Sequence, residues 1–233
     1  MDGFYPARTI ASVLKDIENQ QLVLPAIQRE FVWGEAKICS LFDSLMRGYP
    51  IGGFLFWQVS NLTVQNHAFY GFIKNYDQRP PNNLCPRLGE IAASDSRFAI
   101  LDGQQRLTSL NIGLRGSHTV KLANKWWDNP DAFPKRLLYL DLLASAPDPE
   151  ESGADEETGD TERYVFRFRT PMQVEVENSH GRRWMPGNHS RLQRQENRSR
   201  TVDVTVGELS DGSIEAHDNV VVLDHVHLAG MAA

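Results

Sequence analysis

One segment limits what this chain can fold into more than any other: the apolar run FAIL at residues 98–101, followed at once by the polar run DGQQR at residues 102–106. Four consecutive apolar residues closed by a polar run predict a short, buried strand. Gly103 permits a turn conformation that other residues reach only at a cost. Leu107, Leu110 and Ile112 then give a following helix an inner face. The fold must therefore join a buried strand to a helix through a polar turn.

The residues of this turn are suited to binding an anion. The free N–H groups and the dipole of a helix N-terminus favour negative charge, and Arg106 can hold a phosphate through two parallel hydrogen bonds. Gln104 and Gln105 supply neutral donors and acceptors. Asp102 makes sense beside a phosphate if it holds a metal ion, orients a water molecule or fixes the arginine. The alternative is an aspartate that caps the helix, followed by solvated glutamines.

A second motif, LPAIQREFVWG at residues 24–34, predicts a loop between a strand and a helix. Gln28 and Arg29 lie among apolar residues that can fix the loop, which suits an arginine at the rim of a pocket. A packed connection with Arg29 on the surface is the alternative. Gly52 and Gly53 precede an aromatic strand, and two glycines there indicate close approach of another backbone or a ligand.

The remaining periodicity predicts an α+β domain with a mixed sheet and flanking helices. Apolar residues recur at helical spacing over 10–20 and again from Gly34 to about Gly48. Short apolar or alternating runs predict strands at 22–24, 53–59, 98–101, 136–143 and 163–168. Residues 60–96 contain the Pro80-Pro81-Asn82-Asn83 cluster and are expected to be irregular.

Composition restricts the class of protein. The 233 residues are 41% hydrophobic, which suffices for a core, and the net charge is −6, so a surface that binds nucleic acid must be local. No apolar run approaches the roughly 18 residues that a membrane span needs, and the first residues do not form a signal peptide. A cytoplasmic location without a membrane partner is the expectation.

The cysteines and histidines indicate no metal or redox site. Cys39 and Cys85 form no CxxC pair, and Cys39 is expected in a buried helix stripe. No histidine is assigned to a metal site.

The second half of the chain changes in character. Residues 145–162 form an acidic loop rich in proline and glycine, and residues 178–233 are expected to be a poorly ordered polar extension that ends in a short hairpin within 201–228. Arg182, Arg183, Arg191 and Arg194 suggest an arm that contacts nucleic acid, with an unselected tail as the equal alternative. Trp126-Trp127 is a further candidate for base stacking, although a role in the core or in a lid is favoured.

Taken together, QREFVWG, GYPIGGFLFW and FAILDGQQRLTSL, with a helix between the first two, resemble the DUF262 family. This family forms the N-terminal domain of modification-dependent restriction enzymes of the GmrSD type. The resemblance covers residues 9–143 and weakens towards Thr170, so a domain spanning residues 1–177 is expected. It implies the ParB/sulfiredoxin-like fold, in which a polar strand–helix junction binds nucleotide phosphates. It also implies that Gln28 and Arg29 face the DGQQR run.

The expected function follows from the resemblance: an NTP-binding and NTP-hydrolysing regulatory domain of a DNA restriction system. The partners would be a nucleoside triphosphate with Mg²⁺, DNA, and a separate HNH nuclease, since His225 and His227 do not complete an HNH motif. The expected catalytic residues are Asp102, Gln104, Gln105 and Arg106, with Asp102 as the candidate Mg²⁺ ligand. The expected nucleotide contacts are Gln28, Arg29, Gly103, Arg106 and Thr108. A binding module without turnover and an inactive remnant are the alternatives.

Overall fold

The computed structural model of the chain describes residues 5–26, 30–59, 67–88, 97–144, 162–187, 202–204 and 220–223. Its helices are α1 (Ile10–Glu18), α2 (Glu35–Met46), α4 (Gln104–Arg115), α5 (Pro171–Ser179) and the 3₁₀ turn η1 (Pro130–Ala132). Its strands are β1 (Tyr5–Arg8), β2 (Leu22–Pro25), β3 (Phe54–Val59), β4 (Phe69–Tyr70), β5 (Asn75–Asp77), β6 (Arg97–Asp102), β7 (Ser117–Thr119), β8 (Leu137–Asp141), β9 (Phe166–Arg169), β10 (Trp184–Pro186), β11 (Val202–Val204) and β12 (Val220–Leu223).

The largest sheet has five strands in the order β12-β3-β6-β2-β4. β2 and β6 run parallel, whereas the other neighbours are antiparallel, so the sheet is mixed. β6 lies at its centre because its residues are apolar on both faces, and Ala99 and Ile100 are completely buried. The expected α+β class is confirmed.

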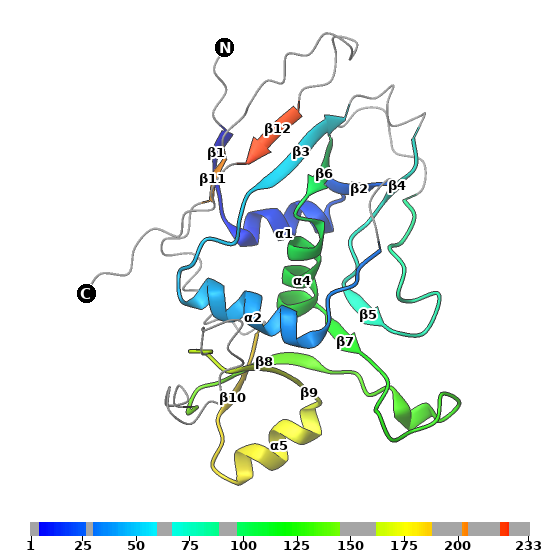
Figure 1. The fold of residues 1–233 in the computed structure, drawn as a ribbon, viewed down its shortest axis with the longest axis vertical. Helices are drawn as coiled ribbons and strands as arrows, with labels where there is room; N and C mark the ends of the chain where they lie inside the picture. Colours follow the sequence, from blue (N-terminus) through cyan, green and yellow to red (C-terminus); the bar gives the residue numbers. More distant parts are fainter. Residues whose placement is uncertain are drawn as a thin grey trace, which may run out of the picture.

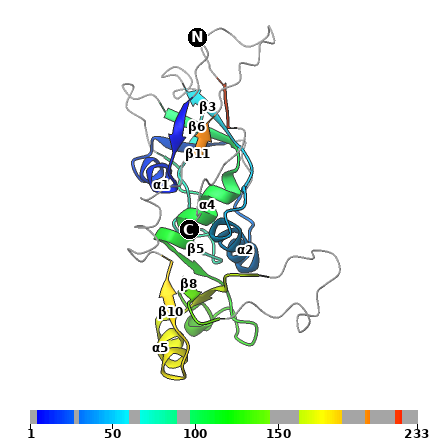
Figure 2. The same cartoon turned by 90° about the vertical axis from the view of Figure 1, so that its left-hand side faces the viewer.

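One hydrophobic core connects this sheet to the rest of the molecule. Figure 1 shows α4 near the middle, between β6 above it and β8 below it. A three-stranded antiparallel sheet, β10-β8-β9, forms the lower part, and Phe166 of β9 packs against Phe42 of α2 with ring centroids 5.5 Å apart. In Figure 2 the molecule is elongated, with α5 at the end opposite β3. Within the described residues, no helix is long and apolar enough to cross a membrane.

Helices α1, α2 and α4 form where the apolar spacing predicts them, whereas α5, which has no buried residue, was not predicted. Thr9 begins α1 by accepting a hydrogen bond from the Ser12 N–H, and Gly34 precedes α2. Cys39 is buried in the stripe of α2, as expected, and burial raises the pKa of its thiol to about 12. Burial also raises the pKa of Cys85 to about 11. Both thiols therefore stay protonated at neutral pH.

Two expectations about secondary structure were wrong. Residues 67–88, expected to be irregular, contain β4 and β5, and β5 pairs in parallel with β7. The two Val-rich runs near the C-terminus do not pair as a hairpin. Instead, β11 pairs with β1 and β12 pairs with β3. Such runs pair with whichever strand edge is free, and the sheets here offered edges far away in the sequence.

The folded part of the chain continues past residue 177. α5 begins with Thr170 and Gln173, whose side chains and backbones form a capping box, and it ends at Ser179. β10 then pairs with β8, and Trp184 is buried. The expectation that no core residue follows residue 178 was therefore wrong for this stretch. The acidic loop at 145–161 lies outside the described residues.

Candidate functional site

The DGQQR run lies where β6 ends and α4 begins. Gly103 is the N-cap of α4 and has φ +91°, in the left-handed region that favours glycine. A Cβ at this position would lie 2.3 Å from a ring carbon of Phe54, so a side chain has no room there. No side chain caps the helix, and the first N–H groups of any helix have no partner within it. The junction therefore presents backbone donors and the positive end of the α4 dipole.

Arg106 is fixed in place from several sides. It donates from Nη1 to the carbonyl oxygen of Ile51 at 2.6 Å and from Nη2 to Oδ2 of Asp102 at 2.9 Å. Its guanidinium also lies 4.7 Å from the ring centroid of Phe54. A Cβ at Gly52 would lie 2.7 Å from Nη1. Gly52 thus makes room for the side chain of Arg106, whereas the sequence had suggested close approach of another backbone or a ligand.

Asp102 contacts the arginine directly. Its side chain is 73% exposed, whereas that of Arg106 is 18% exposed. The sequence suggested that Asp102 holds a metal ion, orients a water molecule or fixes the arginine. The contact seen in the structure is the one with the arginine. Within the described residues, no group of three or more His, Cys, Asp or Glu side chains could hold a metal ion. A single exposed carboxylate suits a Mg²⁺ ion that arrives with substrate phosphates, because such ions take only one or two ligands from the protein.

Gln105 joins the two sequence motifs. Its Nε2 donates to the carbonyl oxygen of Glu30 at 2.9 Å, and its Oε1 accepts from the N–H of Val32 at 3.0 Å. The side chain is buried. Both ends of the amide are occupied by main chain, so Gln105 positions the loop at residues 30–34. Sequence reasoning placed the two motifs together but missed this role.

Gln104 and Thr108 are also buried and polar, but unlike Gln105 each has a side-chain oxygen without a hydrogen-bond partner among the described residues. Gln104 is 4% exposed and Thr108 is completely buried. Neither Oε1 of Gln104 nor Oγ1 of Thr108 has a hydrogen-bond partner among the described residues. Thr108, expected to contact a nucleotide, has no exposed surface with which to do so. Gln104 keeps an acceptor available beside the start of α4.

Gln28 and Arg29 lie outside the described residues. The loop that contains them begins after Ala26, whose N–H donates to the carbonyl oxygen of Ala68 at 3.1 Å. It returns at Glu30, whose carbonyl oxygen is bound by Gln105. The chain therefore comes back beside the DGQQR run immediately after Arg29, which is consistent with the expected arrangement.

A partly buried ion-pair network adjoins this loop and was not foreseen. Glu35, the first residue of α2, accepts from Arg136 at 2.7 and 3.0 Å and lies 3.1 Å from Nδ1 of His118. His118 is buried and stacks on Tyr76, with centroids 4.7 Å apart. The sequence signal was an acidic residue in the first turn of a helix. The network joins α2, β5, β7 and the start of β8.

The expected arginine arm is only partly described. Arg182 donates to Oδ2 of Asp141 at 2.6 Å, and the Asp141 side chain is completely buried. Burial would raise the pKa of Asp141, but the hydrogen bonds from Arg182 and from the N–H groups of Leu143 and Ala144 lower it overall. Arg182 thus serves a structural ion pair. Arg183 is exposed, whereas Arg191 and Arg194 lie outside the described residues.

Comparison with known proteins adds two findings. The family model described as the GmrSD restriction endonuclease N-terminal domain matches residues 10–203. An uncharacterized protein of Methanocaldococcus jannaschii is 25% identical over 187 residues, which are 80% of this chain and 29% of that protein. The chain thus spans less than a third of the length of this relative.

Proposed function

The chain belongs to the family of the GmrSD restriction endonuclease N-terminal domain, and we propose that it binds and hydrolyses a nucleoside triphosphate at the β6–α4 junction. Membership makes the chain a component of a restriction system. In the proposal, nucleotide turnover regulates an HNH nuclease, carried by another domain or subunit, that acts on DNA. One observation carries the nucleotide assignment: an uncapped helix N-terminus at Gly103 lies beside an arginine that is already held in position.

The phosphates are bound by groups that need little rearrangement. The N–H groups at the start of α4 bind phosphate oxygens, and Gly103 lets the backbone approach them closely. Arg106 adds a fixed positive charge beside them. Because its guanidinium is preorganised, it stabilises charge that develops on the phosphates without first being ordered. Arg29 is assigned to the same role.

The two glutamines have different roles in this mechanism. Gln105 is committed to the loop at residues 30–34 through both ends of its amide. Oε1 of Gln104 is unpaired but buried, so we assign to it the orientation of the attacking water once the bound nucleotide has opened the site. Asp102 is the carboxylate that would hold Mg²⁺. When bound, Mg²⁺ neutralises phosphate charge, and Asp102 also keeps Arg106 aligned.

A binding module without turnover is the second candidate. Arg106 is engaged by Ile51, Asp102 and Phe54, and the amide of Gln105 is fully used. These residues could thus maintain a binding surface rather than perform chemistry. In that case nucleotide binding would stabilise the domain and the phosphates would remain intact.

Phosphate release from ATP, GTP, CTP and UTP with Mg²⁺ separates the two candidates. The variant is Asp102→Asn, which keeps the shape of an exposed side chain, and the matched control is Asp128→Asn, an exposed aspartate in the loop before η1. We expect turnover in wild type and in the control, and its loss in Asp102→Asn. Equal turnover in both variants would reject the Asp102 assignment. A rise in melting temperature with nucleotide, without turnover, would establish the binding module.

A further inference from the structure

A cleft of about 840 Å³ lies far from the β6–α4 junction. It is formed by the β5 region, β7 and the segment that leads into β8. α4 begins at the DGQQR run and ends at Arg115, immediately before β7, so the helix separates the two places by about 18 Å. Three cations line the cleft, Lys74, Arg79 and Lys135, against one carboxylate, Asp77. This local excess of positive charge contrasts with the net charge of −6.

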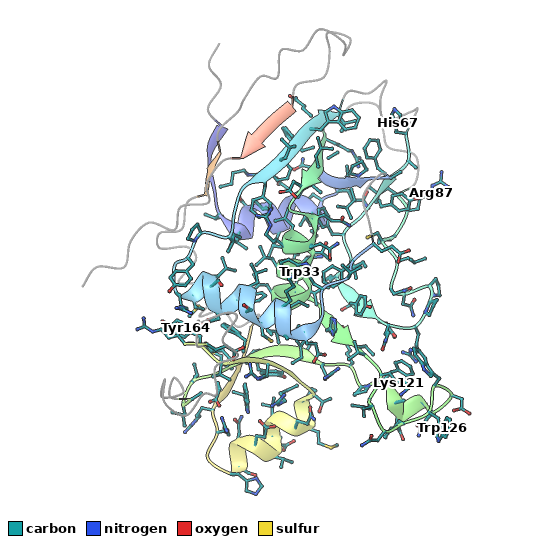
Figure 3. The ribbon with its side chains drawn as sticks, in the orientation of Figure 1. Trp33, His67, Arg87, Lys121, Trp126 and Tyr164 are labelled. Carbon is teal, nitrogen blue, oxygen red and sulfur yellow. The ribbon has the colours of Figure 1, made fainter. Side chains whose placement is uncertain are left out.

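Beside the cleft, residues 120–136 form a loop that projects from the body of the molecule. Figure 3 labels Lys121 and Trp126 on this projection, at the lower right. Internal hydrogen bonds fix the loop, including Leu122 N–H to Ala132 O at 2.8 Å and Asn129 N–H to Trp126 O at 3.2 Å. Lys121 N–H also donates to Oε1 of Gln78 at 2.9 Å. The loop is thus built as a defined structure.

Two tryptophans are exposed on this fixed loop. Trp126 is 82% exposed and Trp127 is 58% exposed. Of the favoured expectation, a role in the core or in a lid, the core role was therefore wrong. Large aromatic side chains normally gain from burial, and when they are exposed on an ordered surface they are typical of binding sites.

The tryptophans and the cleft form one continuous surface. Trp127 packs on Phe133 with ring centroids 5.2 Å apart, and Phe133 lines the cleft. The guanidinium of Arg79 lies 4.7 Å from the Phe133 ring centroid, and Asp77 holds that arginine in place. An aromatic platform therefore runs directly into a basic cleft. On the loop itself Lys121 and Lys125 are offset by the exposed Asp128 and Asp131, so the excess of positive charge lies in the cleft.

We propose that this surface, the Trp126–Trp127 platform together with the basic cleft, binds single-stranded nucleic acid. The phosphates lie along the cleft near Lys74, Arg79 and Lys135, and unpaired bases stack on Trp126 and Trp127. A positively charged groove next to exposed aromatic rings is how proteins bind single strands without reading their sequence. A duplex keeps its base faces stacked inside, so it cannot use the tryptophans. The proposal does not depend on nucleotide binding at the β6–α4 junction.

The cations that line the cleft favour single-stranded nucleic acid over a protein partner. A protein docking on two tryptophans alone would need a mainly apolar surface around them. Here three cations, with Asn75 and Asn82 beside them, lie among the apolar residues that line the adjoining cleft. Charge complementarity therefore favours a polyanion.

The test is binding of a fluorescein-labelled oligothymidine of about 15 nucleotides, followed by anisotropy and by quenching of tryptophan fluorescence. The double variant Trp126→Ala/Trp127→Ala is compared with Met172→Ala, which replaces another exposed apolar side chain. Lys135→Glu is compared with Lys15→Glu, an equal change of charge on α1. We expect the tryptophan variant to lose about tenfold or more in affinity and most of the quenching. Lys135→Glu should weaken binding and lower its salt dependence, and both controls should bind as wild type does.

Three results would overturn the proposal. The first is equal affinity of wild type and the tryptophan variant for the oligonucleotide. The second is equal binding of the matching duplex with no dependence on the tryptophans. The third is absence of oligonucleotide binding together with self-association that the tryptophan variant abolishes, which would make the platform a protein interface.

Discussion

The guanidinium of Arg106 lies over the ring of Phe54, 4.7 Å from its centroid. This stack is enclosed by two glycines: a Cβ at Gly103 would meet the Phe54 ring, and a Cβ at Gly52 would meet the guanidinium. The GGF and DGQQR motifs, which are about 50 residues apart, are therefore two halves of one packed unit. The predictions below test this unit and its neighbours.

Arg106→Lys should destabilise the protein although it keeps the charge. Lysine cannot bond Ile51 and Asp102 in two directions while stacking flat on Phe54. We expect the free energy of unfolding to fall by about 1–2 kcal/mol in urea titrations. Arg163→Lys is the control, since Arg163 is exposed and its contact with Tyr164 is longer, at 5.8 Å. Equal losses in both variants would contradict the account of Arg106.

Gly103→Ala should destabilise the protein more than Gly181→Ala. The two glycines have nearly the same φ, +91° and +93°, so the cost in backbone conformation is matched. Only Gly103 has a neighbour within 4 Å of the added Cβ, the Phe54 ring at 2.3 Å among its contacts. We expect an additional loss of about 1–3 kcal/mol in the Gly103 variant, measured by chemical denaturation. In a Phe54→Leu background, Gly103→Ala should cost less than it does in wild type. An equal cost in the two backgrounds would count against the clash with the Phe54 ring.

Gln105→Ala should release the loop at residues 30–34. The variant removes the acceptor for the Val32 N–H and the donor to the Glu30 carbonyl oxygen. We expect hydrogen exchange at the Val32 amide to accelerate by about tenfold. The Ile38 amide, bonded to Gly34 O within α2, is the internal control. Uniform acceleration of both amides would indicate global destabilisation instead.

The sequence predicted the frame of this region because the frame depends on local signals. Strand β6, the Gly103 turn and helix α4 follow from a run of apolar residues, a glycine and helical spacing. The position of Arg106 relative to Phe54 does not follow, because it depends on how β3 pairs with β6. In the same way, Gln104 and Gln105 look equivalent in sequence, and only packing distinguishes the free acceptor of one from the occupied amide of the other.

Arg182→Ala should reduce stability at neutral pH, and Arg183→Ala should not. Arg182 neutralises Asp141, whose side chain is completely buried, whereas Arg183 is exposed beside it. Because Arg182 is itself 56% exposed, we expect a loss of stability in urea titrations that is smaller than for a fully buried pair. A loss in Arg183→Ala of the same size would contradict this assignment.

The effect of Arg182→Ala should depend on pH. The pKa of Asp141 is lowered in the folded protein, so the ion pair stabilises the fold above the unfolded pKa of about 3.9 and is lost as the pH falls through the lower folded value. The difference in stability between wild type and Arg182→Ala should therefore shrink between pH 5 and pH 3. A difference that stays constant over this range would show that the arginine acts by packing alone.

Local composition gave wrong predictions where a segment packs against residues that are distant in the sequence. Residues 178–187 lack aliphatic side chains, yet Trp184 and the pairing of β10 with β8 make them part of the fold. The buried acceptor of Arg182, Asp141, comes from β8, about 40 residues earlier, and no local pattern reveals it. For Trp126 and Trp127 a role in the core or in a lid was expected from their position in a predicted helix, but they lie in a loop that keeps them exposed.

The pairing of β12 with β3 has a consequence for how the protein is made. β3 ends at Val59 and β12 begins at Val220, so this edge is covered only after about 160 further residues have been synthesised. Until then, the aromatic sequence FLFWQV presents an open strand edge on which another nascent chain can add a strand. The edge of β3 is open until residues 220–223 pair with it. The yield of correctly folded protein should therefore depend on the speed of translation and on the local concentration of chains.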